Sequence, residues 1–254
     1  MVLAIDIGNT HITLGGFYGD ELRFVARMST DTQNTEHEYA AKILNTLSLY
    51  DVKRLSVSGA IISSVVPALN RIMQKAVKLI CDVDAILVAP GIKTGINIKC
   101  DNPSSVGSDI ICACVAAHHI YGSPSLIVDM GTATKMMVVD DRGAFIGVSI
   151  MPGVMMGLQG LASGTAQLPQ VSLDAPPSVI GKNTADCMKS GVVFGNASMV
   201  DGMIDRINEE YGRPLPVYAT GGHSASIVVH CRHEITLDSD MVLKGLNIIY
   251  KNNI

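Results

Sequence analysis

The stretch "LAIDIGNTHITLGGF" (residues 3–17) decides the fold, because an apolar strand breaks at an acidic residue and then resumes as a second strand. Asp6 ends the first apolar run, and Gly8, Asn9 and Thr10 form the turn. An ordinary hairpin needs only Asn-Gly or Asp-Gly between its strands. The extra acid and the threonine therefore predict a turn that binds a polar group.

The same pattern occurs a second time. The stretch "SLIVDMGTATKMMVV" (residues 125–139) repeats the apolar run, an acid at Asp129, a small turn at Gly131 and a further strand. Two strand-like runs follow each acid. Repetition of a whole supersecondary unit is stronger evidence than either motif alone. We predict a mixed α/β fold built twice, with an N-terminal domain at 1–120 and a C-terminal domain at 121–254.

Helices and strands alternate through the rest of the chain. Thr35 and Glu38 have the spacing of a capping box, which predicts a helix start. Helices are expected at 35–50, 68–80, 106–121, 183–211 and 239–250, and strands at 54–62, 85–89 and 216–222, where the last ends in a glycine turn.

Composition excludes several classes of protein. The net charge of −4 argues against nucleic-acid binding, which requires a basic face, and no window reaches the roughly 20 apolar residues of a membrane span. The chain starts directly in a strand, so we expect a cytoplasmic protein without a signal peptide. The six cysteines are expected to be buried free thiols. A mean hydropathy of +0.32 favours apolar surface shared with a second subunit.

The two turns suit a nucleoside triphosphate. Backbone N–H groups without bulky side chains can approach phosphate oxygens closely. A carboxylate at a strand end can hold Mg²⁺, usually through water, and the metal bridges to phosphate. Two such turns, one in each predicted domain, predict that ATP binds in a cleft between the domains. The glycine turn at 220–224 could let adenine lie against the backbone, and no GxxxxGK[ST] motif is present.

The chain also resembles a known family. The duplicated D-x-G-x-T pattern is similar to the actin, hexokinase and Hsp70 superfamily, whose domains have an actin-like (ribonuclease H-like) fold. The motifs "DIGNT", "RMSTD", "TEHEY", "SSVVP", "APGIKTG", "DNPSSVGSD", "DMGTAT", "PGV", "AQLP", "GKNT" and "TGG" resemble those of type III pantothenate kinases, in the same order. The resemblance implies a homodimeric cytoplasmic enzyme that uses ATP to phosphorylate pantothenate, the first step of coenzyme A synthesis. It also implies Mg²⁺ and a monovalent cation, K⁺ or ammonium.

Site residues follow from the resemblance position by position. Asp109 matches the general base, Asp129 matches the monovalent-cation ligand, and Asp6 would hold Mg²⁺ through water. An acid in the first turn of a helix is also favoured by the helix dipole alone, so Asp109 has a structural explanation as well. The implied ATP-binding residues are Asp6, Ile7, Gly8, Asn9, Thr10, His11, Ile12, Thr13 and Thr132, and the implied substrate-binding residues are Cys100, Gly107, Ser108, Asp109, Ile110 and Thr184.

Several positions depart from the family pattern, among them Val148, Met151 and Gly164, and three others bear on the site. Ile110 stands where the family has an arginine beside the base, Cys100 replaces a tyrosine, and Lys135 replaces a threonine. These changes leave two alternatives open: a weak or silent homologue that acts as a nucleotide-binding or regulatory protein, and a kinase for another small alcohol.

Lys135 admits two interpretations. It could act as a tethered positive charge near Asp129 in place of the monovalent cation. Residues alternate faces along a strand, however. If Thr132 and Thr134 face the nucleotide, Lys135 points away and reaches solvent.

Overall fold

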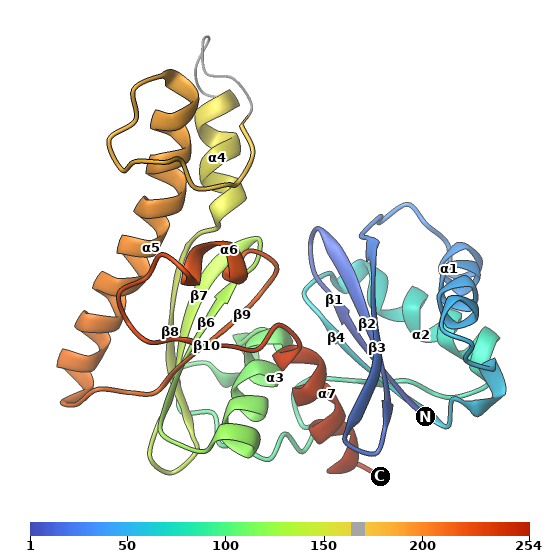
Figure 1. The fold of residues 1–254 in the computed structure, drawn as a ribbon. Coiled ribbons are helices and arrows are strands. Elements are labelled where there is room, and N and C mark those ends of the chain that lie inside the picture. Colours follow the sequence, from blue (N-terminus) through green and yellow to red (C-terminus); the bar gives the residue numbers. More distant parts are fainter. Residues whose placement is uncertain (164–170) are drawn as a thin grey trace. The chain divides into compact units, whose positions relative to one another are not determined.

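The computed structural model describes residues 1–163 and 171–254, and the "AQLP" motif at 166–169 lies outside them. The chain forms two compact units (Figure 1). The first comprises Met1–Tyr121 together with Asp240–Ile254, and the second comprises Gly122–Ser239. Residues 240–254 therefore belong to the first unit by their contacts, and the domain bounds 1–120 and 121–254 stay a prediction.

The first unit contains a five-stranded sheet. Its order is β3-β2-β1-β4-β5, with β1 antiparallel to β2 and parallel to β4. The strands are β1 (Val2–Ile7), β2 (His11–Tyr18), β3 (Glu21–Ser29), β4 (Gly59–Ser64) and β5 (Ile86–Leu87). The apolar strand, turn and second strand expected from residues 3–17 are therefore confirmed as β1, a tight turn and β2.

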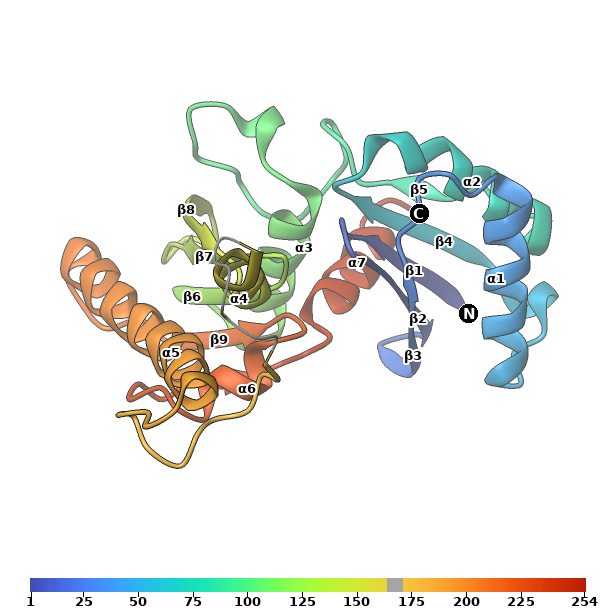
Figure 2. The same ribbon diagram turned by 90° about the horizontal axis from the view of Figure 1, so that it is seen from above.

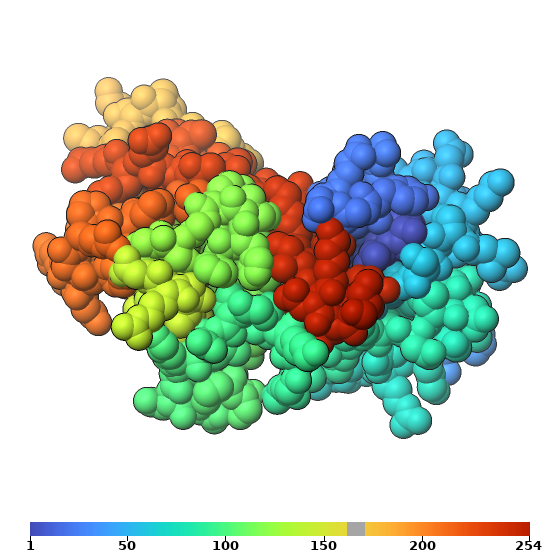
Figure 3. Space-filling model, turned by 90° about the horizontal axis from the view of Figure 1, so that it is seen from below, coloured from blue at the N-terminus to red at the C-terminus, as the bar shows by residue number. Residues whose placement is uncertain are grey.

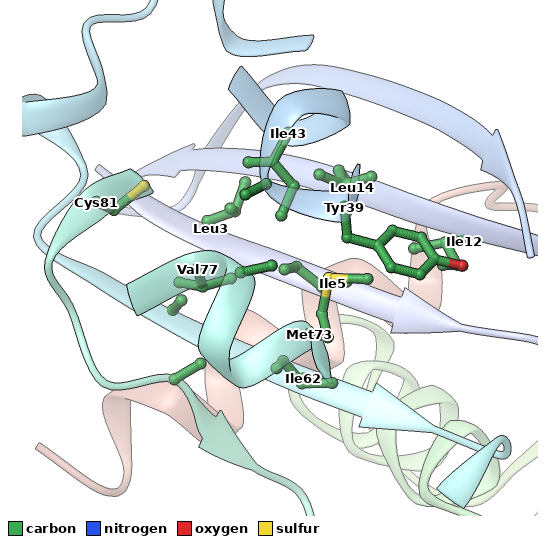
Figure 4. Close-up of a cluster of buried hydrophobic side chains, with 14 of the residues drawn as sticks. Leu3, Ile5, Ile12, Leu14, Tyr39, Ile43, Ile62, Met73, Val77 and Cys81 are labelled. Atoms are coloured by element: carbon green, nitrogen blue, oxygen red, sulfur yellow. The ribbon is translucent and has the colours of Figure 1, made fainter. Parts of the chain in front are cut away.

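One face of this sheet is covered by α1 (Glu36–Leu49) and α2 (Pro67–Cys81). Figure 4 shows Ile5 of β1 and Met73 of α2 within this buried cluster. The predicted capping box is present, because Thr35 accepts from the Glu38 backbone and Glu38 accepts from Thr35. Alternate residues of β1, namely Leu3, Ile5 and Ile7, thus pack against the two helices, and burial of these apolar side chains stabilises the unit.

The opposite face of the first sheet is covered by α3 (Ser108–Ala116) and α7 (Met241–Lys251). A π-helical turn, Ala117–Tyr121, extends α3. The two helices touch closely, because a Cβ on Gly245 would lie 1.9 Å from the Cys112 carbonyl oxygen. Figure 3 shows the red C-terminal residues beside blue residues of the β2–β3 turn, where Asn247 donates to the Gly19 carbonyl at 2.8 Å.

The second unit repeats the topology of the first. Its sheet has the order β10-β9-β6-β7-β8, with β6 antiparallel to β7 and parallel to β9, so β6 corresponds to β1 and β9 to β4. Figure 2 shows α4, α5 and α6 of this unit, which pack on one face of the sheet. The elements are β6 (Ser125–Met130), β7 (Ala133–Val139), β8 (Phe145–Pro152), α4 (Val154–Ser163), α5 (Thr184–Tyr211), β9 (Val217–Thr220), α6 (Ser224–Val228) and β10 (Thr236–Leu237).

Two expectations were wrong in part. The strand expected at 54–62 begins at Gly59, because β1 pairs with β4 only from Val2 onward; Arg54–Ser56 form a 3₁₀ turn instead. The N-terminal ammonium donates to the Ser56 carbonyl at 2.8 Å and holds this turn in place. All six cysteines are free, but only three are buried: Cys187 is exposed, and Cys100 and Cys231 are half-buried.

Across the described ranges, no helix is long and apolar enough to cross a membrane.

Candidate functional site

The first turn joins β1 to β2 and contains Gly8, Asn9 and Thr10. Thr30, directly after β3, forms hydrogen bonds to it. Thr30 donates from its hydroxyl to the Gly8 carbonyl at 2.7 Å and from its backbone to the Thr10 carbonyl at 3.1 Å. The Gly8 N–H donates to the His11 carbonyl at 3.0 Å and closes the turn. Asn9, Thr10 and His11 are exposed. The turn thus has a fixed shape with its middle residues open to solvent.

Asp6 lies between two hydroxyl side chains on neighbouring strands. It is paired directly with Thr13 on β2 and with Ser63 on β4. Directly paired residues project from the same face of a sheet. This is the face that carries Ala4 and Ile61 and is covered by α3 and α7. The carboxylate and both hydroxyls therefore lie on the face of the sheet that α3 and α7 cover.

Ser108 joins α3 to the end of β4. Its hydroxyl lies 2.9 Å from the Ser63 hydroxyl, accepts from the Ser64 N–H at 2.9 Å and donates to the Ser64 carbonyl at 3.1 Å. The side chain is buried. Ser108 therefore fixes the first turn of the helix that carries Asp109, and its part in substrate binding stays a prediction.

Asp109 is the acid of the first turn of α3, and one oxygen accepts from the Ile110 N–H at 2.8 Å. A Cβ on Gly107 would lie 2.6 Å from that oxygen, so glycine leaves room for the carboxylate. Burial raises the pKa of the Cys112 thiol, and the charges of Asp6 and Asp109 raise it further. Both carboxylates thus make ionisation of this buried thiol harder.

The second turn joins β6 to β7 and contains Gly131 and Thr132. Two glycines from other segments approach it closely. A Cβ on Gly153 would lie 2.1 Å from the Thr132 carbonyl oxygen, and one on Gly221 would lie 2.6 Å from Asp129 Oδ1. Gly221 also has a φ of +95°, which side chains rarely adopt. The glycine turn at 220–224 therefore packs on the second turn. Its predicted contact with adenine stays a prediction.

Lys135 forms an ion pair with Asp129. The Lys135 Nζ lies 2.7 Å from Asp129 Oδ2, and the two side chains are only 13% and 12% exposed. The residues are direct partners on β6 and β7, so they project from the same face. Thr134 projects from the other face, where it is fully buried opposite Met130. The interpretation in which Lys135 reaches solvent is therefore wrong.

The remaining predicted residues fall on both units. Cys100 is half-buried in the loop before the 3₁₀ turn Pro103–Ser105, and Ile110 is buried at 6% exposure. Thr132 is exposed in the second turn, and Thr184 is the first residue of α5, after the N-cap Asn183. The predicted base, Asp109, and the turn between β1 and β2 thus both belong to the first unit.

Sequence reasoning missed three residues that shape the site. Ser63 pairs with Asp6, Thr30 supports the first turn, and Gly153 packs on the second turn. Each lies in a quoted motif, namely "SSVVP", "RMSTD" and "PGV". Only the strand register and the backbone approach reveal what these residues do.

The strand partners of Asp6, Thr13 and Ser63, carry hydroxyl oxygens, and Mg²⁺ prefers oxygen ligands. No group of three His, Cys, Asp or Glu side chains suited to a metal occurs in the residues that the structure describes. Mg²⁺ at nucleotide sites is usually held by one or two carboxylates together with phosphates and water. The residues at the first turn therefore fit Mg²⁺ that arrives with a nucleotide.

Comparison with known proteins gives consistent matches. The model of the family described as type III pantothenate kinase matches residues 2–206. A type III pantothenate kinase of Brevibacillus brevis is 41% identical over 100% of this chain and 99% of its own. One of Geobacillus sp. is 37% identical over 100% of this chain and 98% of its own.

A solved structure supports the fold. The putative 2-dehydro-3-deoxygalactonokinase of Sinorhizobium meliloti aligns with a TM-score of 0.61 at 14% identity, covering 99% of this chain and 96% of that one. At this identity the likeness concerns the fold alone. The α/β fold of two related actin- and hexokinase-like domains is confirmed.

Proposed function

The chain belongs to the type III pantothenate kinase family, and from that premise we propose which of its residues carry out the reaction. It is a kinase that transfers the γ-phosphoryl group of ATP to the primary hydroxyl of pantothenate, giving 4′-phosphopantothenate and ADP for coenzyme A synthesis. The observation that supports the assignment of roles is that Asp6 pairs with Ser63, and that the Ser63 hydroxyl lies 2.9 Å from the hydroxyl of Ser108, the residue before Asp109.

The first turn binds the phosphates of ATP. Backbone N–H groups of Asn9 and Thr10 lie in a turn whose shape Thr30 fixes, so they need little reorganisation when phosphate binds. Asp6 would hold Mg²⁺ through water, with the hydroxyls of Thr13 and Ser63 beside it. Bound Mg²⁺ neutralises charge on the phosphate oxygens. The exposed residues Asn9, Thr10 and His11 are proposed as the phosphate contacts. Ile7 and Ile12, which the family pattern also implies, have side chains buried in the core of the first unit.

Asp109 is the proposed general base. Its carboxylate accepts the proton of the pantothenate hydroxyl while that oxygen attacks the γ-phosphorus and ADP leaves. The anchored start of α3 holds Asp109 in place, because Ser108 is bound to both Ser63 and Ser64. Positioning of this kind is the main contribution of a protein to phosphoryl transfer. Cys100, Gly107, Ile110 and Thr184 are proposed to contact pantothenate.

A monovalent cation at Asp129 does not fit the described contacts. The Lys135 ammonium already lies 2.7 Å from Oδ2 of that carboxylate. Thr132, exposed in the second turn, remains the proposed nucleotide contact of the second unit.

A coupled assay of ADP release tests the function. We expect turnover of ATP only when pantothenate is present, and a product of the mass of 4′-phosphopantothenate. Turnover with another small alcohol and none with pantothenate would contradict the assignment. ATP binding without turnover under any condition would contradict it as well.

A homodimer is proposed through the edge strand β8. Alternate residues of this strand are apolar and exposed: Ile146 at 38%, Val148 at 37% and Ile150 at 64%. A row of exposed apolar side chains on an edge strand favours pairing with another chain. A second copy of this chain is the proposed partner, since the family pattern implies a dimer. A cytoplasmic location is also proposed, because ATP serves as the phosphoryl donor.

The variant Ile150→Lys is expected to convert the dimer into a monomer, because a charge would replace the most exposed apolar side chain of the proposed contact. Light scattering after size-exclusion chromatography measures the mass. Leu55→Lys is the matched control, since Leu55 is 78% exposed in the 3₁₀ turn of the first unit. A dimer that withstands Ile150→Lys, or a control that also dissociates, would contradict the assignment of β8.

A further inference from the structure

The ion pair between Lys135 and Asp129 lies where the family pattern implies a monovalent cation. Its two charged atoms are 2.7 Å apart and the side chains are 13% and 12% exposed. Charged side chains are rarely buried to this extent unless they are paired. The pair is therefore a built feature of the second turn rather than a surface contact.

Both oxygens of the Asp129 carboxylate have close neighbours. Oδ2 faces the Lys135 ammonium, and Oδ1 lies against Gly221, where a Cβ would come within 2.6 Å. A Cβ on Gly131 would lie 3.6 Å from the same oxygen. A free cation at Asp129 would also meet the like charge of the ammonium in a partly desolvated place.

The internal repeat identifies what the lysine has replaced. Asp6 of the first unit pairs with Thr13, and Asp129 of the second unit pairs with Lys135. On the parallel side, Asp6 pairs with Ser63 and Asp129 pairs with Thr220. The first unit thus keeps a carboxylate with two neutral hydroxyls, whereas the second has exchanged one hydroxyl for an ammonium group.

We propose that the Lys135 ammonium takes the place of the monovalent cation in this enzyme, so that its reaction proceeds without K⁺ or ammonium ion. The inference rests on the proposed function. A lysine ammonium is a compact point charge with the same unit charge as those ions. The β6–β7 pairing holds it beside the second turn, so it is a positioning residue for that turn and its carboxylate.

The test compares the unmodified enzyme with Lys135→Thr in K⁺, ammonium or tetramethylammonium chloride at equal ionic strength. The unmodified enzyme is expected to keep its turnover within about twofold in all three salts, since no free ion is needed. Lys135→Thr is expected to lose roughly 10²-fold in tetramethylammonium, as for removal of one preorganised group, and to recover in K⁺ or ammonium. Lys189→Thr is the matched control, because Lys189 also lies 2.7 Å from its partner, Asp174, in the same unit. It should remain indifferent to the salt.

A second readout does not depend on activity. The melting temperature of Lys135→Thr should rise with K⁺ concentration, and that of the unmodified protein should not, because only the variant gains an ion site. If Lys135→Thr does not fold, Lys135→Gln replaces it in both experiments. Strong K⁺ dependence of the unmodified enzyme would overturn the proposal. So would a folded Lys135→Thr that is inactive in every salt or active in all of them. Absence of pantothenate-dependent turnover in the unmodified enzyme would instead contradict the function, and the melting temperatures would still test the lysine.

Discussion

Asp109→Asn is expected to reduce pantothenate-dependent turnover by about 10²–10⁴-fold, the usual contribution of a general base. The amide has nearly the same shape as the carboxylate, but it cannot accept the hydroxyl proton. Ser108 still anchors the start of α3 to Ser63 and Ser64, so the fold should be preserved. ATP affinity should change little, because the phosphate contacts are assigned to the first turn. Steady-state kinetics and titration with ATP measure the two quantities.

The control separates catalysis from the helix dipole. Glu36→Gln removes an acid from the first turn of α1, which has no assigned part in the reaction. It should leave turnover unchanged. If Asp109→Asn keeps full turnover, Asp109 has only the structural role that the helix dipole provides. If the variant loses ATP binding together with turnover, the Asp109 carboxylate contributes to nucleotide binding and not to proton transfer.

Gly153→Ala is expected to disturb the second turn more than its size suggests. The added Cβ would lie 2.1 Å from the Thr132 carbonyl oxygen and 2.8 Å from that of Gly131. These are backbone atoms, so the turn itself must move. Overpacking of this kind costs about 1–3 kcal/mol of the free energy of unfolding. A shift of about 1 Å in a positioning element costs roughly 10²-fold in rate.

Denaturant unfolding and steady-state kinetics check both effects. Gly191→Ala is the matched control, because no atom lies within 4 Å of a Cβ there and the residue is inside α5. Alanine in a helix interior is favoured over glycine by about 0.5–1 kcal/mol, so this variant should be slightly more stable and fully active. A Gly153→Ala enzyme with normal stability and normal kinetics would mean that the second turn adapts without cost.

The repeat could be predicted from the sequence because both copies keep the same local signals. Apolar runs, an acid and small turn residues define β1 and β6, and these choices are made within a few residues. Local signals of this kind act in the same way wherever the segment lies in the fold. The helix start at Thr35 was predictable for the same reason, since a capping box involves only four residues.

The surroundings of the acids could not be predicted in this way, because they depend on register and on contacts between distant segments. The strand register sets Lys135 opposite Asp129, and alternation of faces alone left its direction open. The position of Ser63 beside Asp6 depends on the parallel pairing of β1 with β4. Gly153 and Gly221 approach the second turn from other parts of the chain. Sequence spacing does not contain these distances.

The return of residues 240–254 to the first unit has a consequence for synthesis on the ribosome. The second unit, Gly122–Ser239, is continuous in sequence, so all of its strands leave the ribosome before α7 does. The first unit still lacks Leu243, Leu246 and Ile249, which cover Ala4 and Ile61 on its sheet. Domains generally fold as units once their segments are available. The half of the enzyme that begins first is therefore expected to finish last, and a nascent chain halted before Met241 would leave apolar surface uncovered on the face that carries Asp6.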